Sequence, residues 1–389
     1  MMVSITSLQT WTTQYSLAMH PVYIFVDNLR IGGFQRLALD QAYALSDRGF
    51  SPTIFVLDDP HLENVPSFLN SEMEIIVGKD VSIKRLGRSR TGQISAINEL
   101  FSQGCLPDLL LSHSLRATSF LLLVSLRRMK SLKTISTIHQ LPTLSAPRQR
   151  FQRFLYASLS WRLLAYSVAV QSDWESRIAS NTMLRLLFGR KQIAVMRNGI
   201  YLDRLPRHVN VSNLTSSRRL IFLGRNTAWK GIATFLEVAS QPALSSFEIL
   251  FMIPDEKDLS IRDLPSELQR RIQIVAGKSI SSFVPQHGDV HLYPANYGPG
   301  AKYVESVSLN CLELACLGVP TVLTKGGLGT WPDLAEFSIF FETDWKDPGL
   351  VADQVIEVSE KTYTNSEIEK MMGCIDIQNQ ISNLLRISN

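Results

Sequence analysis

Two glutamates stand close together in the stretch VESVSLNCLELACLGVP, residues 304–320. Seven residues separate Glu305, which lies among small polar residues, from Glu313, which lies inside an apolar helical pattern that Gly318 ends. A glutamate in the middle of an apolar helix needs a polar partner. Glu305 could simply favour the helix dipole, yet carboxylates also accept hydrogen bonds from vicinal hydroxyls. The pair therefore suits a ribose on one side and a sugar on the other.

Two cations precede another helical pattern, in FLGRNTAWKGIATFLEVA. Arg225 and Lys230 are five residues apart, and two cations beside a helix start suit a diphosphate better than one cation does. A pair of exposed surface cations is the simpler alternative. Near the amino terminus, Gly32 and Gly33 open a helical pattern after VYIFVD, which would let a ligand reach the helix amides. This glycine pair could equally form a turn, and it is not the GxGxxG pattern of nicotinamide dehydrogenases.

Continuous apolar runs alternate with amphipathic helical patterns along the chain, which is typical of a doubly wound parallel sheet. The first series of predicted strands covers 22–27, 52–57, 74–77, 108–113, 134–139, 167–172 and 192–199. The second series covers 219–225, 247–254, 272–277, 290–295, 320–327 and 337–343. Ligands of such sheets bind beyond the carboxyl ends of the strands. The residues of interest are therefore those that follow each apolar run.

The chain is too long for one hydrophobic core, because its 389 residues exceed the usual limit of about 250–300. A polar segment without periodicity, YLDRLPRHVNVSNLTSSRR at 201–219, separates the two series and is the linker candidate. The sequence predicts an α/β protein with two Rossmann-like domains, over 1–200 and 201–372, that face each other across a cleft. Residues 373–389 are predicted to form a helical segment that packs back toward the first domain.

Composition argues against several classes of protein. Charged residues make up 19% of the chain and hydrophobic residues 45%, so large-scale disorder is not expected. The four cysteines contain no CxxC pair, which argues against a disulfide framework or a zinc site and favours a reducing compartment. The first twenty residues lack a basic start and a continuous apolar run, so we expect no signal peptide or anchor. A cytoplasmic protein fits these features.

Positive charge is concentrated in the first half of the chain. Residues 1–195 contain 21 Lys and Arg against 13 Asp and Glu, whereas the remainder contains 18 against 22. The basic residues form clusters at 84–90, 127–133 and 148–153, and such clusters attract anionic surfaces. The two interpretations are an anionic membrane surface, to which the chain would bind peripherally, and a solvated basic face. We expect no nucleic-acid partner.

The chain resembles glycosyltransferase family 4 in four stretches that follow one another in the family's order and spacing. They are YIFVDNLRIGGFQRLALDQAYALSDRGF, VMRNGIYLDRL, LGRNTAWKG, and the glutamate pair followed by CLGVPTVLTKGG. The resemblance covers nearly the whole chain from about residue 20. It implies a retaining enzyme of the GT-B fold that uses a nucleotide-sugar donor without a metal. Bacterial members commonly build surface polysaccharides and lipid-linked glycans at the inner face of the cytoplasmic membrane.

In the second domain, the resemblance implies a donor site made of two cations, two carboxylates and helix amides. Arg225 and Lys230 would hold the donor diphosphate. Glu313 would bind the ribose hydroxyls of the nucleotide, and Glu305 would contact the transferred sugar. The backbone amides near the phosphate would be those of Val307, Ser308 and Leu309.

In the first domain, the resemblance places Gly33 opposite the donor diphosphate. It places Asn198, in the pair Asn198-Gly199, where the chain enters the interdomain segment. His139, in STIHQLP, matches an active-site histidine near the sugar and the acceptor. His113, in LLLSHS, is a second candidate, although a histidine at a strand end is more often structural than catalytic.

Three motifs depart from the family pattern. Ser306 and Ser308 replace the glycines of the usual EGFG, and serine fits fewer backbone conformations than glycine. Arg197 replaces the proline of the usual PNG. The glycine-rich turn that normally follows the next strand is Ile-Pro-Asp-Glu at 253–256, a change in the region that recognises the nucleotide base.

The resemblance implies a transfer in which two cations and helix amides stabilise the leaving diphosphate. The acceptor hydroxyl, on a glycan or a lipid-linked acceptor, would attack from the same face, and no metal or other cofactor would be needed. No enzyme nucleophile is required, so the glutamate pair is not the acid and base couple of a glycosidase. Two alternatives stay open. One is a nucleotide-sugar epimerase of the same fold, which would need further carboxylates and histidines in the first domain, and the other is a non-catalytic nucleotide-sugar-binding subunit.

Overall fold

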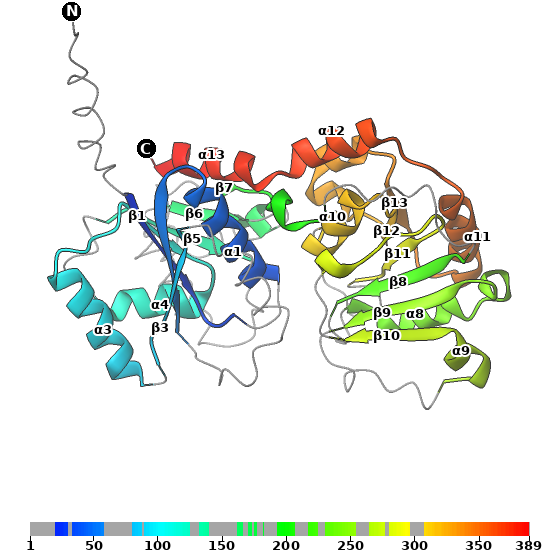
Figure 1. Ribbon diagram of the computed structural model, residues 1–389, viewed down its shortest axis with the longest axis horizontal. Coiled ribbons are helices and arrows are strands. Elements are labelled where there is room, and N and C mark those ends of the chain that lie inside the picture. Colours follow the sequence, from blue (N-terminus) through cyan, green and yellow to red (C-terminus); the bar gives the residue numbers. More distant parts are fainter. Residues whose placement is uncertain are drawn as a thin grey trace, which may run out of the picture.

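The structure is a computed structural model that shows two parallel β-sheets with helices packed against them (Figure 1). The strands of both sheets pair in parallel. The structure describes residues 20–29, 33–57, 80–87, 89–124, 132–139, 162–165, 170–172, 175–176, 182, 193–206, 217–224, 230–253, 264–276, 280–295 and 307–388.

The N-terminal sheet has seven strands in the order β3-β2-β1-β4-β5-β6-β7. Its strands are β1 (His20–Val26), β2 (Phe50–Val56), β3 (Ser82–Arg85), β4 (Leu109–Ser112), β5 (Thr134–Ile138), β6 (Arg162–Ala165) and β7 (Ile193–Val195). Its helices are α1 (Gly33–Ser46), α3 (Arg90–Ser102) and α4 (Leu115–Val124). Along β1, Ile24 packs in the cluster that contains α1, whereas Phe25 packs in the cluster with α3 and α4. Both faces of this sheet are therefore buried, which is why its strands are continuous apolar runs.

The C-terminal sheet has six strands in the order β10-β9-β8-β11-β12-β13. Its strands are β8 (Arg219–Leu223), β9 (Glu248–Ile253), β10 (Ile272–Ala276), β11 (Val290–Tyr293), β12 (Thr321–Thr324) and β13 (Phe340–Thr343). Its helices are α8 (Ile232–Ala239), α9 (Ser266–Arg271), α10 (Leu309–Cys316) and α11 (Pro348–Ser359). Side chains along β8 alternate between two clusters in the same way, with Ile221 in one and Phe222 in the other. The predicted α/β fold with two Rossmann-like sheets is confirmed.

Two predicted elements of the first sheet differ from the structure. The strand at 167–172 is wrong, because β6 lies earlier in the chain and residues 170–172 are helical. The stretch WRLLAYSVAVQS offers two apolar runs, and the first of them pairs with β5. The sequence does not predict β3, SIKR, because this edge strand is half basic and only partly buried. The predicted strand at 74–77 lies outside the described residues.

The chain passes between the two sheets at two places, and these two segments are paired with each other. Ile200 forms a parallel bridge with Asp376, in which the Ile200 amide donates to the Ile375 carbonyl and the Ile377 amide donates to the Ile200 carbonyl, both at 2.9 Å. A Cβ atom at Gly199 would lie 2.7 Å from the Cα atom of Ile377. Glycine is therefore required where the two segments cross.

The C-terminal helices extend from the second sheet to the first. A capping box at Thr364 and Glu367 begins α12 (Asn365–Ile375), and α13 (Ile377–Ser388) follows it. Figure 1 shows α13 beside α1, at the edge of the N-terminal sheet. Arg48 Nε donates to Gln378 Oε1 at 2.8 Å, and Gln41 donates to Gln380 at 3.2 Å. The last helix is therefore held against the N-terminal sheet by polar contacts.

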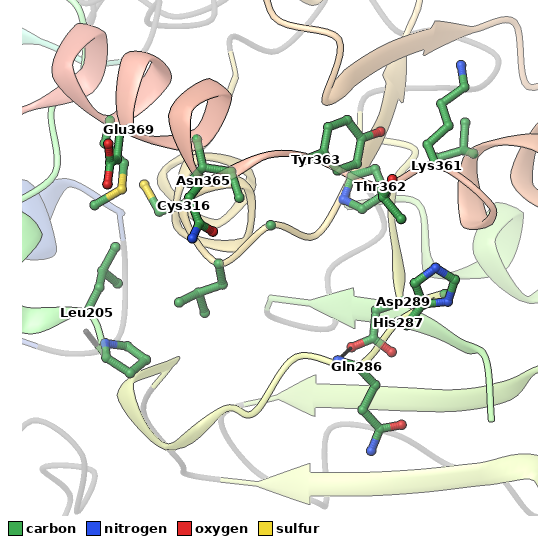
Figure 2. A pocket seen from close by; sticks show the side chains of 18 of the residues that line it. Leu205, Gln286, His287, Asp289, Cys316, Lys361, Thr362, Tyr363, Asn365 and Glu369 are labelled. Carbon is green, nitrogen blue, oxygen red and sulfur yellow. Dashed lines mark hydrogen bonds between the residues drawn. The ribbon is translucent and has the colours of Figure 1, made fainter. Parts of the chain in front are cut away.

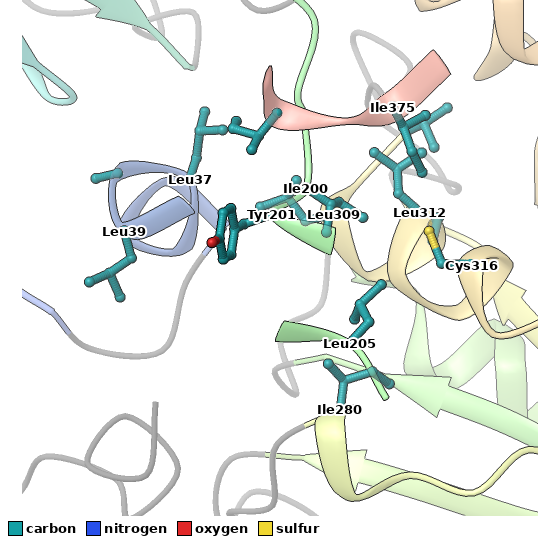
Figure 3. Close-up of a cluster of buried hydrophobic side chains, with 14 of the residues drawn as sticks. Leu37, Leu39, Ile200, Tyr201, Leu205, Ile280, Leu309, Leu312, Cys316 and Ile375 are labelled. Carbon is teal, nitrogen blue, oxygen red and sulfur yellow. The ribbon is translucent and has the colours of Figure 1, made fainter. Parts of the chain in front are cut away.

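One hydrophobic cluster runs from α1 through the linker to α10 (Figure 3). Leu37 on α1, Leu205 in the linker and Leu312 on α10 all belong to it and are buried. Such burial stabilises by roughly 1.5–3 kcal/mol for each large apolar side chain. The described start of the linker, residues 201–206, is thus packed between the two halves, although its sequence shows no periodicity.

Candidate active site

Strand order reverses between β1 and β4 in the N-terminal sheet, and polar groups gather at the carboxyl ends of these strands. Asp27 follows β1, and its Oδ1 accepts a hydrogen bond from Ser114 Oγ at 2.6 Å. The amide of His113 donates to the carbonyl of Phe25 at 3.1 Å, which ties the end of β4 to β1. Asn28 accepts a hydrogen bond from Gln35 of α1 at 3.0 Å. These contacts fix the geometry of this edge.

The two candidate histidines lie together at this edge. His113 Nδ1 is 3.1 Å from His139 Nε2, and their rings stack with centroids 5.3 Å apart. Phe34, at the start of α1, lies 5.8 Å from the His139 ring. Burial lowers the pKa of His139 to about 4, and burial together with the neighbouring His139 lowers the pKa of His113 well below its usual value. Both rings are therefore neutral at pH 7. The N–H group of one ring donates a hydrogen bond to the bare nitrogen of the other.

Gly33 is exposed at the first position of α1. A Cβ atom placed there would meet no atom within 4 Å. The space in front of the helix start is therefore open among the described residues, as a ligand approaching the helix amides would require.

Strand order also reverses between β8 and β11 in the C-terminal sheet. Lys230 is buried there, and its Nζ donates to the hydroxyl of Tyr293, the last residue of β11, while lying 4.7 Å from the ring centroid. Gly231 caps α8 with φ +74°, and a Cβ atom there would lie 2.2 Å from the carbonyl oxygen of Pro294. The glycine of the WKG sequence thus lets α8 begin against β11. This contact positions Lys230 at the carboxyl end of the sheet.

The start of α10 lies at the same edge. Asn310 donates to the carbonyl of Leu223 at 2.9 Å, which ties the first turn of α10 to the end of β8. Ser308 is the N-cap, but its hydroxyl makes no capping hydrogen bond to a backbone amide and lies 3.3 Å from Cys311 Sγ. The amides of the first turn are consequently left without a side-chain cap. A small cavity beside this turn is lined by Tyr293, Ala295, Val307, Leu323, Thr324 and Gly327.

The backbone conformation at Ser308 shows whether serine is strained where the family pattern has glycine. Its φ of −77° and ψ of 160° are extended values that any residue adopts. Serine in place of the usual glycine therefore introduces no strain at this position. Ser306 and Glu305 lie outside the described residues, as does Arg225.

Glu313 has a protein partner that the sequence does not predict. Arg204, in the short 3-10 helix η3 (Leu202–Arg204), donates through Nη2 to Glu313 Oε1. Its Nε also donates to Asp40 Oδ1 of α1, at 3.0 Å. The sequence does not predict Arg204 or Asp40 as site residues. Arg204 lies in a segment without periodicity, and Asp40 lies inside an amphipathic helix. Asn198 lies at the crossing of the two interdomain segments, one residue before Gly199.

A larger pocket of about 480 Å³ lies elsewhere, beside α12 (Figure 2). Residues 286–289, which precede β11, line it together with Gly318 and Pro320, which precede β12. The pocket is therefore at the amino ends of these strands, opposite the edge at which parallel sheets bind ligands. Its other walls come from the linker, at Leu205, and from α12, at Asn365 and Glu369.

In the described part of the chain there is neither a cluster of metal-ligand side chains nor a helix that could span a membrane. No group of three or more His, Cys, Asp or Glu side chains there is arranged to hold a metal ion. No helix there is long and apolar enough to cross a bilayer.

Comparison with known proteins shows the fold. No protein-family model and no curated protein sequence matches the chain. It is similar to sucrose-phosphate synthase from Thermosynechococcus elongatus, with 14% identity and a TM-score of 0.66 over 94% of this chain and 98% of the other. It is also similar to HepE from Anabaena in complex with UDP and glucose, with 14% identity and a TM-score of 0.64 over 94% and 99%.

An α-glucosyltransferase in complex with UDP and a 13-mer DNA containing an HMU base is a third similar structure, with 13% identity and a TM-score of 0.63 over 95% of this chain and 99% of the other. These neighbours are glycosyltransferases of the GT-B fold. The chain therefore has the GT-B fold, and the structural similarity covers nearly the whole length of these proteins.

Proposed function

We propose that this chain is a retaining glycosyltransferase of family 4, which moves a hexosyl group from a nucleotide-sugar donor to a hydroxyl of a glycan or lipid-linked acceptor. The observation that carries the proposal is the position of polar groups at the switch points of both sheets. A neutral histidine pair lies at one, and a buried lysine with an uncapped helix start lies at the other. The UDP bound in two similar structures supports a nucleotide-sugar as the donor.

The C-terminal part, residues 201–372, binds the donor in this proposal. Lys230, Arg225 and the first amides of α10 hold the diphosphate, because a helix start and two cations favour negative charge. Glu313 accepts hydrogen bonds from the ribose, and Glu305 contacts the sugar. The same groups stabilise the charge that develops on the diphosphate as it leaves.

The N-terminal part, residues 1–200, binds the acceptor. The bond between the anomeric carbon and the phosphate oxygen breaks, and the acceptor oxygen bonds to that carbon on the same face. The acceptor proton passes to the departing phosphate oxygen, so the mechanism uses no enzyme nucleophile, metal or other cofactor. Neutral His139 donates or accepts a hydrogen bond beside the sugar without adding charge.

Donor hydrolysis tests this proposal. UDP-, GDP- and dTDP-sugars are incubated with the chain, and the release of nucleoside diphosphate is followed. We expect slow release from at least one donor, loss of release in Lys230→Ala, and retention in Lys346→Ala, whose side chain is exposed and belongs to neither switch point. Binding without release would favour a non-catalytic subunit, and conversion of the donor to its epimer would favour an epimerase.

The cellular role proposed is surface polysaccharide synthesis on the inner face of the cell membrane. The family resemblance supports it, as does the excess of 21 Lys and Arg over 13 Asp and Glu in residues 1–195. An anionic membrane surface would hold the basic half of the chain near a lipid-linked acceptor.

A further inference from the structure

Three buried charged side chains from three elements form one network around Arg204. Arg204 comes from the linker, Asp40 from α1 and Glu313 from α10, and their side chains are 5%, 0% and 7% exposed. Arg204 donates to both Asp40 oxygens, with Nε 3.0 Å from Oδ1 and Nη2 3.3 Å from Oδ2. The amide of Tyr201 also donates to Asp40 Oδ2, at 3.2 Å. Asp40 therefore fixes the guanidinium from the side of the N-terminal sheet.

The two oxygens of Glu313 have different surroundings. Oε1 accepts the hydrogen bond from Arg204 Nη2. Oε2 accepts no hydrogen bond from any residue that the structure describes. A carboxylate oxygen accepts hydrogen bonds from hydroxyl groups, so this oxygen suits a ligand that brings its own hydroxyl.

We propose that Arg204 is a positioning residue for the donor: it holds Oε1 of Glu313 and thereby presents Oε2 to the ribose hydroxyls of the nucleotide. This inference rests on the proposed function, in which Glu313 binds the ribose. Without the guanidinium, Oε1 would lose its donor and the carboxylate would be free to rotate. Because Asp40 orients Arg204, recognition of the ribose beside the C-terminal sheet depends on a residue of α1, which packs on the N-terminal sheet.

The measurable consequence is discrimination between ribose and deoxyribose. Hydrogen bonds to a charged group typically change affinity about tenfold or more. If the network merely holds the two halves together, its loss would change the affinities for the ribonucleotide and for the 2′-deoxyribonucleotide by the same factor. The ratio of their affinities therefore separates positioning from a structural role.

The experiment is calorimetric titration of UDP and GDP and of their 2′-deoxy counterparts into the full chain. We expect the unmodified chain to prefer a ribonucleotide about tenfold or more. Arg204→Gln should reduce this preference to below about threefold, and Arg204→Lys should retain part of it, because lysine keeps the charge but not the planar fork. Glu313→Gln should abolish the preference, and adding Arg204→Gln to Glu313→Gln should cause no further loss.

Arg219→Gln is the matched control. Arg219 is another buried arginine, which donates to Asp289 at 2.8 and 2.6 Å at the opposite, amino end of the C-terminal strands. We expect its loss to lower stability and to leave the preference unchanged. Circular dichroism of each variant establishes that it folds.

Each outcome bears on a different claim. If the unmodified chain binds no nucleotide, the proposed function fails and this inference fails with it. If it binds nucleotides without preference, or if Glu313→Gln keeps the preference, Glu313 does not bind the ribose and the inference fails while donor binding stands. An unchanged preference in folded Arg204→Gln, or failure of both Arg204 variants to fold, would give Arg204 a structural role and overturn the proposal.

Discussion

At the scale of single residues, the histidine pair shows how burial sets chemistry. Desolvation holds His113 and His139 in the neutral form. A neutral ring can orient a hydroxyl without placing positive charge next to the donor sugar. This arrangement differs from a histidine that acts as a cationic acid near pH 7.

The pair also makes stability depend on pH. The unfolded chain binds a proton at each histidine near pH 6.5, whereas folded His139 binds one only near pH 4. Its contribution to stability is therefore complete above pH 6.5 and is lost as the pH falls toward 4. We expect the free energy of unfolding, measured in urea between pH 7 and pH 5, to fall less steeply in His139→Asn than in the unmodified chain. Equal slopes would show that His139 is solvated in the fold.

Gly33 allows a prediction that separates binding from stability. A Cβ atom there meets no atom within 4 Å, and alanine favours a helix by up to about 1 kcal/mol over glycine. Gly33→Ala should therefore keep or slightly raise stability while lowering donor affinity severalfold, because the methyl group enters the space in front of α1. Gly373→Ala, in α12, has equally open surroundings. This control should leave donor affinity unchanged, and equal affinities in both variants would exclude Gly33 from the donor site.

The sequence predicts poorly which partner a side chain finds when that partner comes from another element. Glu313 is predicted to need a polar partner, and the structure supplies Arg204. No local pattern marks that arginine, because its role depends on the linker packing between α1 and α10. Ser308 shows the converse, since its departure from glycine has no consequence at an extended backbone position.

At the scale of elements, close approach of backbone determines which glycines matter. Gly231 has φ +74° and would bring a Cβ atom within 2.2 Å of the Pro294 carbonyl oxygen. Gly104 has φ +80° but would place its Cβ atom in open space. Gly231→Ala should therefore destabilise by several kcal/mol and displace Lys230, whereas Gly104→Ala should cost only about 1–2 kcal/mol for the left-handed backbone. Urea unfolding checks both values, and similar costs would contradict the tight contact between α8 and β11.

Strands are predictable here because both faces of each sheet are covered. Continuous apolar runs then identify the central strands, and most of the predicted strands are found in the structure. Apolar runs do not identify β3, which is a partly exposed edge strand. They also mislead at 167–172, because two apolar runs are adjacent there and only the first forms a strand, β6. Register and pairing decide that choice, and these are properties of the sheet rather than of the segment.

At the scale of the whole molecule, the two sheets are connected by three kinds of contact. The crossing segments pair at Ile200 and Asp376, α13 packs on α1, and the Arg204 network joins α1 to α10. The sequence predicts the two sheets and the return of the C-terminal helix. It does not show that residues 201–206, the described start of the linker, are largely buried, because burial between two halves leaves no periodic signal in so short a segment.

The distribution of charge leads to a prediction for the whole chain. Residues 1–195 carry 21 Lys and Arg against 13 Asp and Glu, and Lys84 and Arg85 lie on the edge strand β3. We expect the chain to bind vesicles that contain anionic phosphatidylglycerol and to bind neutral vesicles weakly. Binding should weaken as salt rises from 0.1 to 1 M, because the Debye length falls from about 10 to 3 Å.

Two double variants test whether the basic half carries this binding. Lys84→Glu with Arg85→Glu should weaken vesicle binding further, whereas Lys346→Glu with Lys361→Glu, in the acidic half, should have little effect. Sedimentation with vesicles measures the bound fraction at each salt concentration and for each variant. A bound fraction that does not change with salt would contradict binding by charge.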